Sequence, residues 1–329
     1  MKNSTNSRSQ KFWRLFFLAT FGFVVAITLL PFWPETSLFS ILGYVLLFAP
    51  RWWVLAIPLF LILGYRSYSR WQRYALLPLF VLCINFLDVQ WLPSYSIDET
   101  DTLDIKVMSV NVGNSGDKQS LRRLIEENEP YVVFLQEARK ASMEQIFDDS
   151  WITDCAGSLC IASKFAIQRV DALSRRSLGG WGAFATKYNA DIFGEKVQLI
   201  NVHLDTPRAV LEGLIHMDVD ISNADDNSLS RNVQASLVSS WVEDRLPAII
   251  AGDFNMPDNE NIYQRYLGKL NNVLDYSDIG LRYTKYTKWH GIRIDHILFS
   301  DYFTAKRADV LDDFGGDHRP VLAVLGQPI

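Results

Sequence analysis

The sequence has few of the residues that build zinc sites or disulfide frameworks. Among its 329 residues are three cysteines and five histidines, and no cluster of them has the spacing of a structural zinc site. Cys155 and Cys160 enclose a four-residue loop that could close as a disulfide in an oxidising compartment, but two small core thiols explain the pair equally well. Cys83 lies in an apolar run, so we expect it to be inert.

The chain also lacks a basic run, and its charge is unevenly distributed. Residues 1–100 hold eight of the 32 Lys and Arg and four of the 37 Asp and Glu, so residues 101–329 carry 24 basic and 33 acidic residues, a net charge of −9. Nucleic-acid binding draws most of its affinity from Lys and Arg contacts with phosphate. The composition therefore gives little support to a nucleic-acid substrate. A local patch formed by Arg169, Arg175, Arg176 and Lys187 remains open.

Long uncharged runs occur in the first hundred residues, and the sequence shows no internal repeat or low-complexity tract. Residues 15–33 contain no charge and residues 74–92 contain one, Asp88, and both runs are close to the ~20 residues needed to cross a bilayer. Residues 37–65 are long enough for two passes but are broken at Pro50-Arg51. We predict a membrane region over residues 1–92 with three transmembrane helices, at 15–33, 41–65 and 74–92.

Basic residues set the orientation of these helices. One cluster precedes the first helix and another precedes the last: Lys2, Arg8, Lys11 and Arg14, then Arg66, Arg70 and Arg73. Such clusters stay in the cytoplasm, so an even number of crossings separates them. One crossing within 37–65 satisfies this, with 37–49 in the interface or extending a kinked helix. We therefore expect a multi-pass protein of the inner membrane with a periplasmic domain; a fourth crossing and a cleaved signal peptide are the alternatives.

Beyond a polar linker, residues 93–102, the pattern changes to short strands and helices over residues 103–329. Strands are predicted at 104–112, 131–138, 159–163, 182–187, 196–203, 246–252, 292–299 and 320–325. Helices are predicted at 117–130, 207–217, 228–244 and 258–269. Because these elements mix without strict alternation, we expect an α/β fold in which mixed sheets are covered by helices.

Polar residues stand at the ends of several of these apolar strands. They are Asn111, Glu137, His203, Asp253, Asn255 and Asp295, and Asp317 and His318 precede the last strand. Each alone has an ordinary explanation as a turn residue, a surface charge, a core histidine or a cap. Four carboxylates gathered at strand ends would repel one another, however, unless a cation lay among them. Carboxylate and amide oxygens suit Mg²⁺, so the pattern predicts an ionic site.

Six motifs carry these residues in a fixed order: "SVNVG", "FLQEA", "NVHLD", "GDFNMP", "RIDHILFS" and "GGDHRPV". The set resembles the endonuclease/exonuclease/phosphatase superfamily over about residues 104–325. The resemblance implies a four-layer α/β sandwich like that of pancreatic deoxyribonuclease, with two mixed sheets flanked by helices. It also implies a hydrolase of phosphoric ester bonds that uses Mg²⁺, with Mn²⁺ as an alternative.

The resemblance further implies which residues hold the metal. Glu137 would be the main Mg²⁺ ligand, with Asn111 beside it and Asp317 near the metal or its waters. The chain departs from many nuclease members in one respect, because Gly113 and Asn114 stand where those members have a second acidic residue.

The remaining motif residues would carry out the hydrolysis. By resemblance, Asp253 would position or deprotonate the attacking water and Asn255 would hold a phosphate oxygen. His318, oriented by Asp295, would contact the phosphoryl oxygens, and His203 would stabilise charge from the other side. Fixed donors aimed at the charge that develops on phosphoryl oxygens are the main source of rate in such reactions.

Other polar and aromatic residues have weaker assignments. Arg231 and Gln234 match an "RxxQ" pattern on a predicted helix, where they share a face that is either functional or simply solvated. His296 points to the opposite side of its strand from Asp295, so we expect it in the core. Trp181 and Trp289 either contact substrate or pack in the interior.

The sequence thus favours a membrane-anchored, Mg²⁺-dependent phosphodiesterase whose partners are the bilayer and a phosphoester substrate, with no obligate protein partner evident. A phospholipid and extracytoplasmic DNA remain open as substrates. One alternative is a binding module that kept the fold and lost catalysis, which the intact motif residues argue against. Another is a structural membrane protein, which would bind no metal.

Overall fold

Two mixed β-sheets form the centre of the protein, in a computed structural model that describes residues 2–36, 38–91, 102–113, 116–218 and 220–329. The first sheet has the strand order β15 (Thr304–Val310), β16 (Val321–Pro328), β2 (Thr102–Asn111), β3 (Val132–Gln136), β5 (Leu159–Ser163) and β4 (Ile152–Ala156). The second has the order β10 (Asn271–Asn272), β14 (Asp295–Phe299), β9 (Ala248–Asp253), β8 (Glu195–His203), β7 (Ala183–Ile192) and β6 (Ile167–Ser174).

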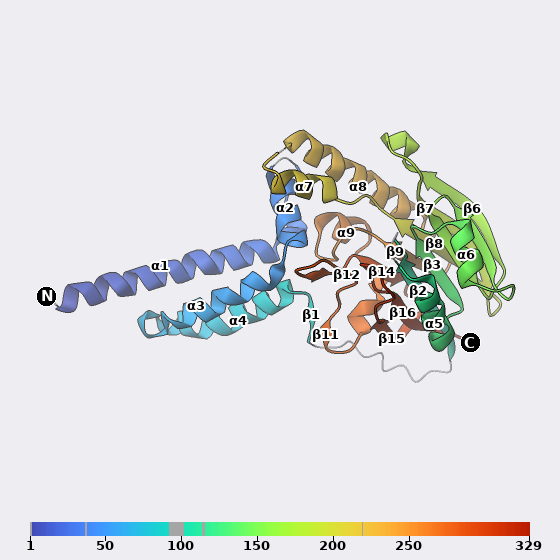
Figure 1. Ribbon diagram of the computed structural model, residues 1–329. Coiled ribbons are helices and arrows are strands. Elements are labelled where there is room, and N and C mark those ends of the chain that lie inside the picture. Colours follow the sequence, from blue (N-terminus) through green and yellow to red (C-terminus); the bar gives the residue numbers. More distant parts are fainter. Residues whose placement is uncertain (1, 37, 92–101, 114–115, 219) are drawn as a thin grey trace.

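The two sheets pack face to face and helices cover their outer faces (Figure 1). Alternation along β2 shows the arrangement, because Val107 faces the second sheet whereas Met108 packs under α5 (Lys118–Asn128) and α6 (Lys140–Ile146). Along β9, Ile249 likewise faces the first sheet and Ile250 packs under α8 (Ile221–Trp241) and α9 (Asn261–Tyr266). The predicted four-layer α/β sandwich is confirmed.

Two parallel strand pairs bring polar strand ends together. β2 is parallel to β3 and β8 is parallel to β9, and all other pairings in the two sheets are antiparallel. Parallel neighbours finish at the same edge of a sheet. The residues that end these four strands therefore lie at one edge of the sandwich.

The N-terminal helices extend away from the sandwich (Figure 1). α1 (Lys2–Thr28), α3 (Ala56–Ile62) and α4 (Arg70–Phe86) lie side by side, whereas α2 (Leu38–Phe48) turns against α7 (Arg208–Ile215) and α8. Among the described residues, the stretch Arg8–Thr28 is long and apolar enough to cross a membrane. The pair Leu38–Phe48 and Arg51–Ile62, bent by 85°, makes a second such segment if it is one broken span.

Two of the predicted transmembrane helices differ from what the structure contains. The predicted helix 41–65 is not continuous, because the chain bends between Phe48 and Arg51, where Pro50 lacks the N–H that a helix needs. The predicted helix 74–92 appears as α4, which begins earlier and ends at Phe86 after 17 residues. The predicted linker, 93–102, lies outside the described residues except for Thr102, which begins β2.

Short or exposed elements were missed by the sequence analysis. β4, β6 and β15 carry many exposed residues and so show no apolar run, and α6 has only seven residues. α8 begins at Ile221 rather than at the predicted residue 228, because Asp220 caps it by accepting from the Asn223 N–H. α9 covers only part of the predicted helix 258–269.

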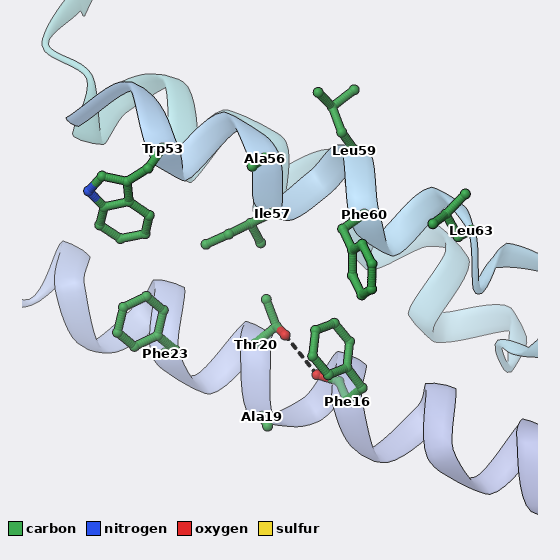
Figure 2. Close-up of a pocket in the computed structure, with 10 residues that line it drawn as sticks. All are labelled: Phe16, Ala19, Thr20, Phe23, Trp53, Ala56, Ile57, Leu59, Phe60 and Leu63. Carbon is green, nitrogen blue, oxygen red and sulfur yellow. Dashed lines mark hydrogen bonds between the residues drawn. The ribbon is translucent and has the colours of Figure 1, made fainter. Parts of the chain in front are cut away.

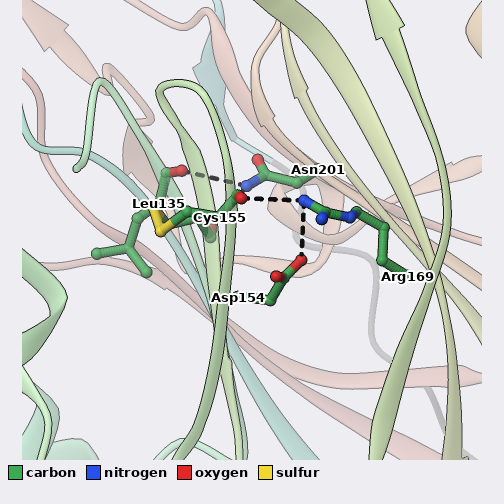
Figure 3. Close-up of a disulfide and its surroundings, with 6 residues drawn as sticks. Leu135, Asp154, Cys155, Arg169 and Asn201 are labelled. Atoms are coloured by element: carbon green, nitrogen blue, oxygen red, sulfur yellow. Dashed lines mark hydrogen bonds and ion pairs between the residues drawn. A yellow bond between two sulfur atoms is a disulfide. The ribbon is translucent and has the colours of Figure 1, made fainter. Parts of the chain in front are cut away.

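Cys155 and Cys160 form a disulfide that ties β4 to β5 (Figure 3). Around it, the Arg169 guanidinium donates to the Cys155 carbonyl at 2.9 Å and pairs with Asp154 at 3.3 Å. The Asn201 amide donates to the carbonyls of Leu135 and Cys160, which links the second sheet to the first. The alternative of two free core thiols is wrong for this pair.

Candidate active site

Three adjacent strands of the second sheet place polar residues in register at the site. In β8 and β9, which are parallel, His203 pairs with Asp253, and the antiparallel β14 pairs Asp295 with the same residue. From the first sheet, Asn111 ends β2 opposite Gln136, and Glu137 follows directly with a positive φ of 56°. The strand ends that the sequence singled out therefore meet where the two sheets face each other.

Asn111 joins the carboxylates of the two sheets. Its Nδ2 donates to Glu137 Oε1 at 3.1 Å and to Asp253 Oδ2 at 3.0 Å, and its Oδ1 accepts from the Gly113 N–H at 3.0 Å. In this arrangement the amide nitrogen, rather than the oxygen, faces the carboxylates. Asn111 thus positions Glu137 and Asp253. It would offer its Oδ1 to a cation between them only after the side-chain amide had rotated to exchange the places of Oδ1 and Nδ2.

His203 stands beside the same two carboxylates. Its Nε2 lies 3.9 Å from Glu137 Oε1 and 3.8 Å from Asp253 Oδ2. On the other side, the Arg175 guanidinium donates to the His203 carbonyl and pairs with Asp205, 2.6 Å away. These bonds hold the end of β8 in place, and the sequence carried no signal for the role of Arg175.

Asp295 and His318 form a buried carboxylate–imidazole pair. Nδ1 of His318 lies 3.0 and 2.9 Å from the two Asp295 oxygens, and its Nε2 lies 3.7 Å from Asp253 Oδ2. Burial lowers the pKa of His318, but the charge and hydrogen bonds of Asp295, with help from Asp253, outweigh it and raise the pKa to about 9. The raised pKa favours the imidazolium form of His318, although the charge of Lys285 acts against it, and the carboxylate fixes the orientation of the ring.

Lys285 is a site residue that the sequence analysis missed. It lies on β12 (Lys285–Tyr286), and its Nζ is 2.7 Å from Asp317 Oδ2 and 2.7 Å from His318 Nε2. The second contact is a hydrogen bond only when His318 is neutral, because an imidazolium has no free lone pair on Nε2. No motif marks a lysine on a two-residue strand, so only the fold brings it to the site.

Asp317 faces Lys285 at the entrance of the site. Burial raises the pKa of its carboxyl, but the hydrogen bond and charge of Lys285, together with His318, lower it below the ordinary value. Asp317 is therefore ionised, and its Oδ1 lies beside Gly113, two residues after Asn111. Asn114, the other position where the chain departs from nuclease members, lies outside the described residues.

Asn255 sits on a sharp turn supported by α8. It has a positive φ of 49°, its N–H donates to Asp253 Oδ1 at 2.8 Å, and its side chain donates to the Leu204 carbonyl at 2.9 Å. Arg231, fully buried beside Glu260, donates to the Asn255 carbonyl at 2.6 Å. The interpretation of Arg231 and Gln234 as a solvated face is wrong, because both hold loops at the site.

His296 takes no part in this cluster. It is buried, its Nε2 donates to the Met256 carbonyl at 2.9 Å, and burial lowers its pKa to about 4. The prediction that it belongs to the core is confirmed. By contrast, Trp181 and Trp289 are 82% and 75% exposed, so neither packs in the interior, and the charged groups beside their rings are Arg176 and Lys288 rather than residues of the cluster.

The donor set suits a divalent cation with oxygen ligands. Asp253, Asp295 and His318 place one ligand atom each within 4.8 Å of one another, although Asp295 already directs both oxygens at His318. The accessible carboxylates of the cluster are Glu137, whose side chain is 40% exposed, and Asp317, at 52%. Residues that would hold a cation are therefore Glu137 and Asp317, with Asp253 and Asn111 beside them, which adds Asp253 to the predicted set of Asn111, Glu137 and Asp317.

Comparisons with known proteins agree with this geometry. The sequence model of the Endonuclease/Exonuclease/phosphatase family matches residues 108–318. A family protein from Bacteroides thetaiotaomicron is similar in structure, with a TM-score of 0.52 and 18% identity over 70% of this chain and 100% of the other. D. rerio TDP2 in complex with a single-strand DNA product has a TM-score of 0.52 and 15% identity over 68% of this chain and 98% of the other.

A third structure of similar fold is a mannosyl-6-phosphatase from Bacteroides thetaiotaomicron, with a TM-score of 0.50 and 19% identity over 67% of this chain and 99% of the other. No curated protein matches the sequence. Identities this low show the fold alone, whereas the family match spans all eight predicted site residues. The chain therefore belongs to the Endonuclease/Exonuclease/phosphatase family, whose members hydrolyse phosphoric esters and generally use divalent metals.

Proposed function

We propose that the protein is a membrane-anchored phosphodiesterase that uses Mg²⁺, or Mn²⁺ in its place, and water as the nucleophile. The observation that carries the proposal is the meeting of Glu137, Asp253, His203 and the Asp295–His318 pair at one edge of the sandwich. Asn111 bonds to carboxylates of both sheets there, so the groups are held before any substrate arrives. Such preorganisation favours catalysis by fixed charges and dipoles.

The hydrolysis needs one proton acceptor and several donors. Water adds to phosphorus, the P–O bond to the leaving alcohol breaks, the water loses a proton and the alcohol gains one. Asp253 is the proton acceptor, since it lies at the centre of the cluster and is bonded by Asn111 and Asn255. A bound divalent cation would offset charge on the phosphoryl and leaving oxygens.

Positive groups on the opposite side of Asp253 face the phosphoryl oxygens. Asp295 favours the imidazolium form of His318, and Lys285 lies 2.7 Å from its Nε2. When His318 is protonated, these two cations repel and both are available to an anion. A phosphate that enters between them would accept from His318 and Lys285 together, while His203 donates from the other side.

Membrane anchoring has support from the N-terminal helices. A cleft of about 850 Å³ opens between α1 and α3, lined by apolar side chains such as Phe16, Phe23, Trp53, Ile57 and Phe60 (Figure 2). Its one hydroxyl, on Thr20, donates to the Phe16 carbonyl of its own helix, and most of the other lining side chains are hydrocarbon. Such a surface favours lipid as its surroundings.

The two basic clusters of these helices meet at the turn between α3 and α4. Arg14 Nε, in the first half of α1, donates at 2.9 Å to the carbonyl of Ser67, which stands next to Arg66 in this turn (Figure 1). If α1, the bent pair Leu38–Phe48 and Arg51–Ile62, and α4 each carry the chain across the bilayer, both basic clusters face the cytoplasm and the sandwich lies on the periplasmic side. A disulfide between Cys155 and Cys160 suits that compartment.

The test is an assay of the full chain in detergent. Plasmid DNA, mixed phospholipids and a chromogenic phosphodiester are offered with Mg²⁺ or Mn²⁺, with Asp253→Asn and a chelator as controls. We expect turnover that disappears in both controls. Metal binding without turnover by the wild type on any substrate would favour the inactive binding module, and no metal binding at all would favour the structural membrane protein.

A further inference from the structure

One short segment connects the active site to the ends of the N-terminal helices. We call residues 285–292, which form β12, a turn and β13 (Gly291–Ile292), the junction hairpin. In Figure 1, β12 lies on the side of the sandwich that faces the helices. The catalytic residues and the membrane region therefore share a structural element that neither the motifs nor the family match pointed to.

The base of the junction hairpin belongs to the active site. Lys285 contacts His318 and Asp317 at 2.7 Å each, and the Tyr286 N–H donates to the Asp317 carbonyl at 2.7 Å. The Arg319 guanidinium lies over the Tyr286 ring, 4.9 Å from its centre. Any movement of this hairpin would therefore move Asp317 and His318.

Both flanks of the junction hairpin are bonded to the ends of helices. His290 Nε2 donates to the carbonyl of Phe48, the last residue of α2, at 2.8 Å. Just before the hairpin, the Tyr283 hydroxyl donates to the carbonyl of Leu87, the residue after α4, at 3.0 Å. The short strand β11 (Gly280–Leu281) also pairs with β1 (Val89–Gln90), which follows α4.

The turn of the junction hairpin presents a tryptophan and a lysine to the surroundings. The Thr287 hydroxyl accepts from the N–H groups of Trp289 and His290, which forms a tight turn. At its tip Trp289 is 75% exposed, and Lys288 Nζ lies 5.4 Å from the centre of its ring. Trp52, at the start of the segment that leads into α3, is exposed as well. Tryptophan and lysine are the side chains that favour the headgroup layer of a bilayer.

The distance between the site and this layer is short. His290 lies five positions after Lys285, and an extended chain over five positions reaches at most about 17 Å. Phe48, to which His290 is bonded, lies three residues before the segment Arg51–Ile62 that enters the helical bundle. The active site therefore lies within about 17 Å of His290, whose partner Phe48 lies next to the segment that enters the bundle.

Three of the four residues suggested for a nucleic-acid patch are engaged in ion pairs, and the fourth, Arg176, lies over the Trp181 ring. Arg169 pairs with Asp154, Arg175 with Asp205, and Lys187 with Glu243. A long DNA backbone would need several such cations free to contact phosphate. The geometry therefore favours a substrate that lies in the membrane surface.

We propose that the substrate is a phosphoester carried by a lipid, and that the junction hairpin rests on the bilayer surface with Trp289 and holds the site over the headgroups. This proposal rests on the membrane anchoring and the phosphoesterase activity proposed above. The reaction is the same hydrolysis, with the lipid phosphate as electrophile and either the headgroup alcohol or the diacylglycerol as the leaving alcohol.

The test uses the full chain reconstituted in vesicles of phosphatidylcholine, phosphatidylethanolamine, phosphatidylglycerol and phosphatidic acid. Release of lipid phosphate or headgroup is compared with hydrolysis of soluble bis(p-nitrophenyl) phosphate by the same vesicles. The variant is Trp289→Ala, and the matched control is Trp181→Ala, an equally exposed tryptophan on the loop before β7. We expect Trp289→Ala to lower the ratio of lipid rate to soluble rate by about tenfold, because one interfacial aromatic is lost, and Trp181→Ala to keep the wild-type ratio.

Three results would overturn the proposal while leaving the proposed function intact. In the first, the wild type hydrolyses the soluble diester or DNA but no vesicle lipid. In the second, Trp289→Ala keeps the wild-type ratio. In the third, Trp181→Ala lowers the ratio as much as Trp289→Ala does. No turnover of any substrate with Mg²⁺ or Mn²⁺ would instead contradict the proposed function itself.

A second variant tests the contact between the junction hairpin and the bilayer if Trp289→Ala loses all activity through misfolding. Lys288→Glu reverses the charge beside Trp289 and should be repelled by anionic headgroups. We expect its ratio of lipid rate to soluble rate to fall as the phosphatidylglycerol content rises. A ratio that does not depend on phosphatidylglycerol content would contradict the role of the junction hairpin.

Discussion

Asp88, just past the end of α4, forms a bidentate ion pair with Arg293, two residues before Asp295 in the active site. The Asp88 oxygens lie 2.8 and 2.9 Å from Nε and NH2 of Arg293, which is fully buried, and Asp88 also pairs with Arg282 at 2.8 Å. Glu35, before α2, makes similar bonds to Asn232 and Arg265. The N-terminal region is thus bound to the sandwich at residues next to the site, so the activity should be tested on the full chain.

Replacing Asp88 should destabilise the sandwich as well as the helices. Asp88→Ala leaves Arg293 with two acidic neighbours, Asp258 and Asp275. We therefore expect the free energy of unfolding to fall by about 2 kcal/mol, less than when a buried charge is left wholly unpaired. Thermal unfolding in detergent measures it. Asp104→Ala removes a pair with Lys306 that is largely exposed and should cost less than about 0.5 kcal/mol. Equal effects of the two variants would contradict this account of the interface.

Glu137 should be required for stabilisation by metal. In the wild type we expect Mg²⁺ to raise the melting temperature, because a ligand that binds the folded state shifts unfolding upward. Glu137→Gln removes one of the two accessible carboxylates of the site, Asp317 being the other, and should abolish that increase. The matched control is Glu144→Gln on α6, an exposed position that should keep it. A metal-dependent increase that survives in Glu137→Gln would place the cation elsewhere.

The Asp295–His318 pair should make stability depend on pH in a defined direction. Since the pKa of His318 is raised from 6.5 to about 9 in the folded protein, its contribution to stability is fully present below pH 6.5 and is lost as the pH rises through about 9. The raised pKa corresponds to at most about 3 kcal/mol. Unfolding of the metal-free chain between pH 6 and 10 measures this loss, and Asp295→Asn should remove most of the dependence. A pH dependence unchanged in Asp295→Asn would show that another group titrates.

Lys285 should contribute to catalysis through its charge. Lys285→Met removes a cation that faces the phosphoryl oxygens, so we expect kcat/KM to fall by about 10- to 100-fold. It should also let the pKa of Asp317 rise, because Lys285 is the main group that holds it down, and so move any acidic limb of the pH profile that Asp317 controls to higher pH. Lys269→Met, at an exposed position, serves as the control. Unaltered kcat/KM and pH profile in Lys285→Met would exclude this role.

Much of the fold and of the site follows from local signals in the sequence. Asn111, Glu137, His203, Asp253 and Asp295 each stand at an end of an apolar run, where a polar side chain marks the limit of a mostly buried strand. Most buried strands were therefore predicted close to their observed bounds, but the prediction for β7 stopped five residues short of Ile192 and the edge strands β4, β6 and β15 were missed. The family resemblance depended on the same strand ends, and the match over residues 108–318 confirms it.

Other features depended on partners far away in the chain. Lys285 reaches His318 from 33 residues away, and Asp88 reaches Arg293 from 205 residues away. Neither pair has a spacing or periodicity that marks it, because each contact exists only once two separately formed elements pack together. The sequence by itself determined which strands end at the polar residues of the site and which family these strand ends resemble. Only the tertiary structure decided that Lys285 lies beside His318 and that the N-terminal region is bound to the sandwich next to the site. The physical reason is that burial and charge pairing arise only when these elements pack together.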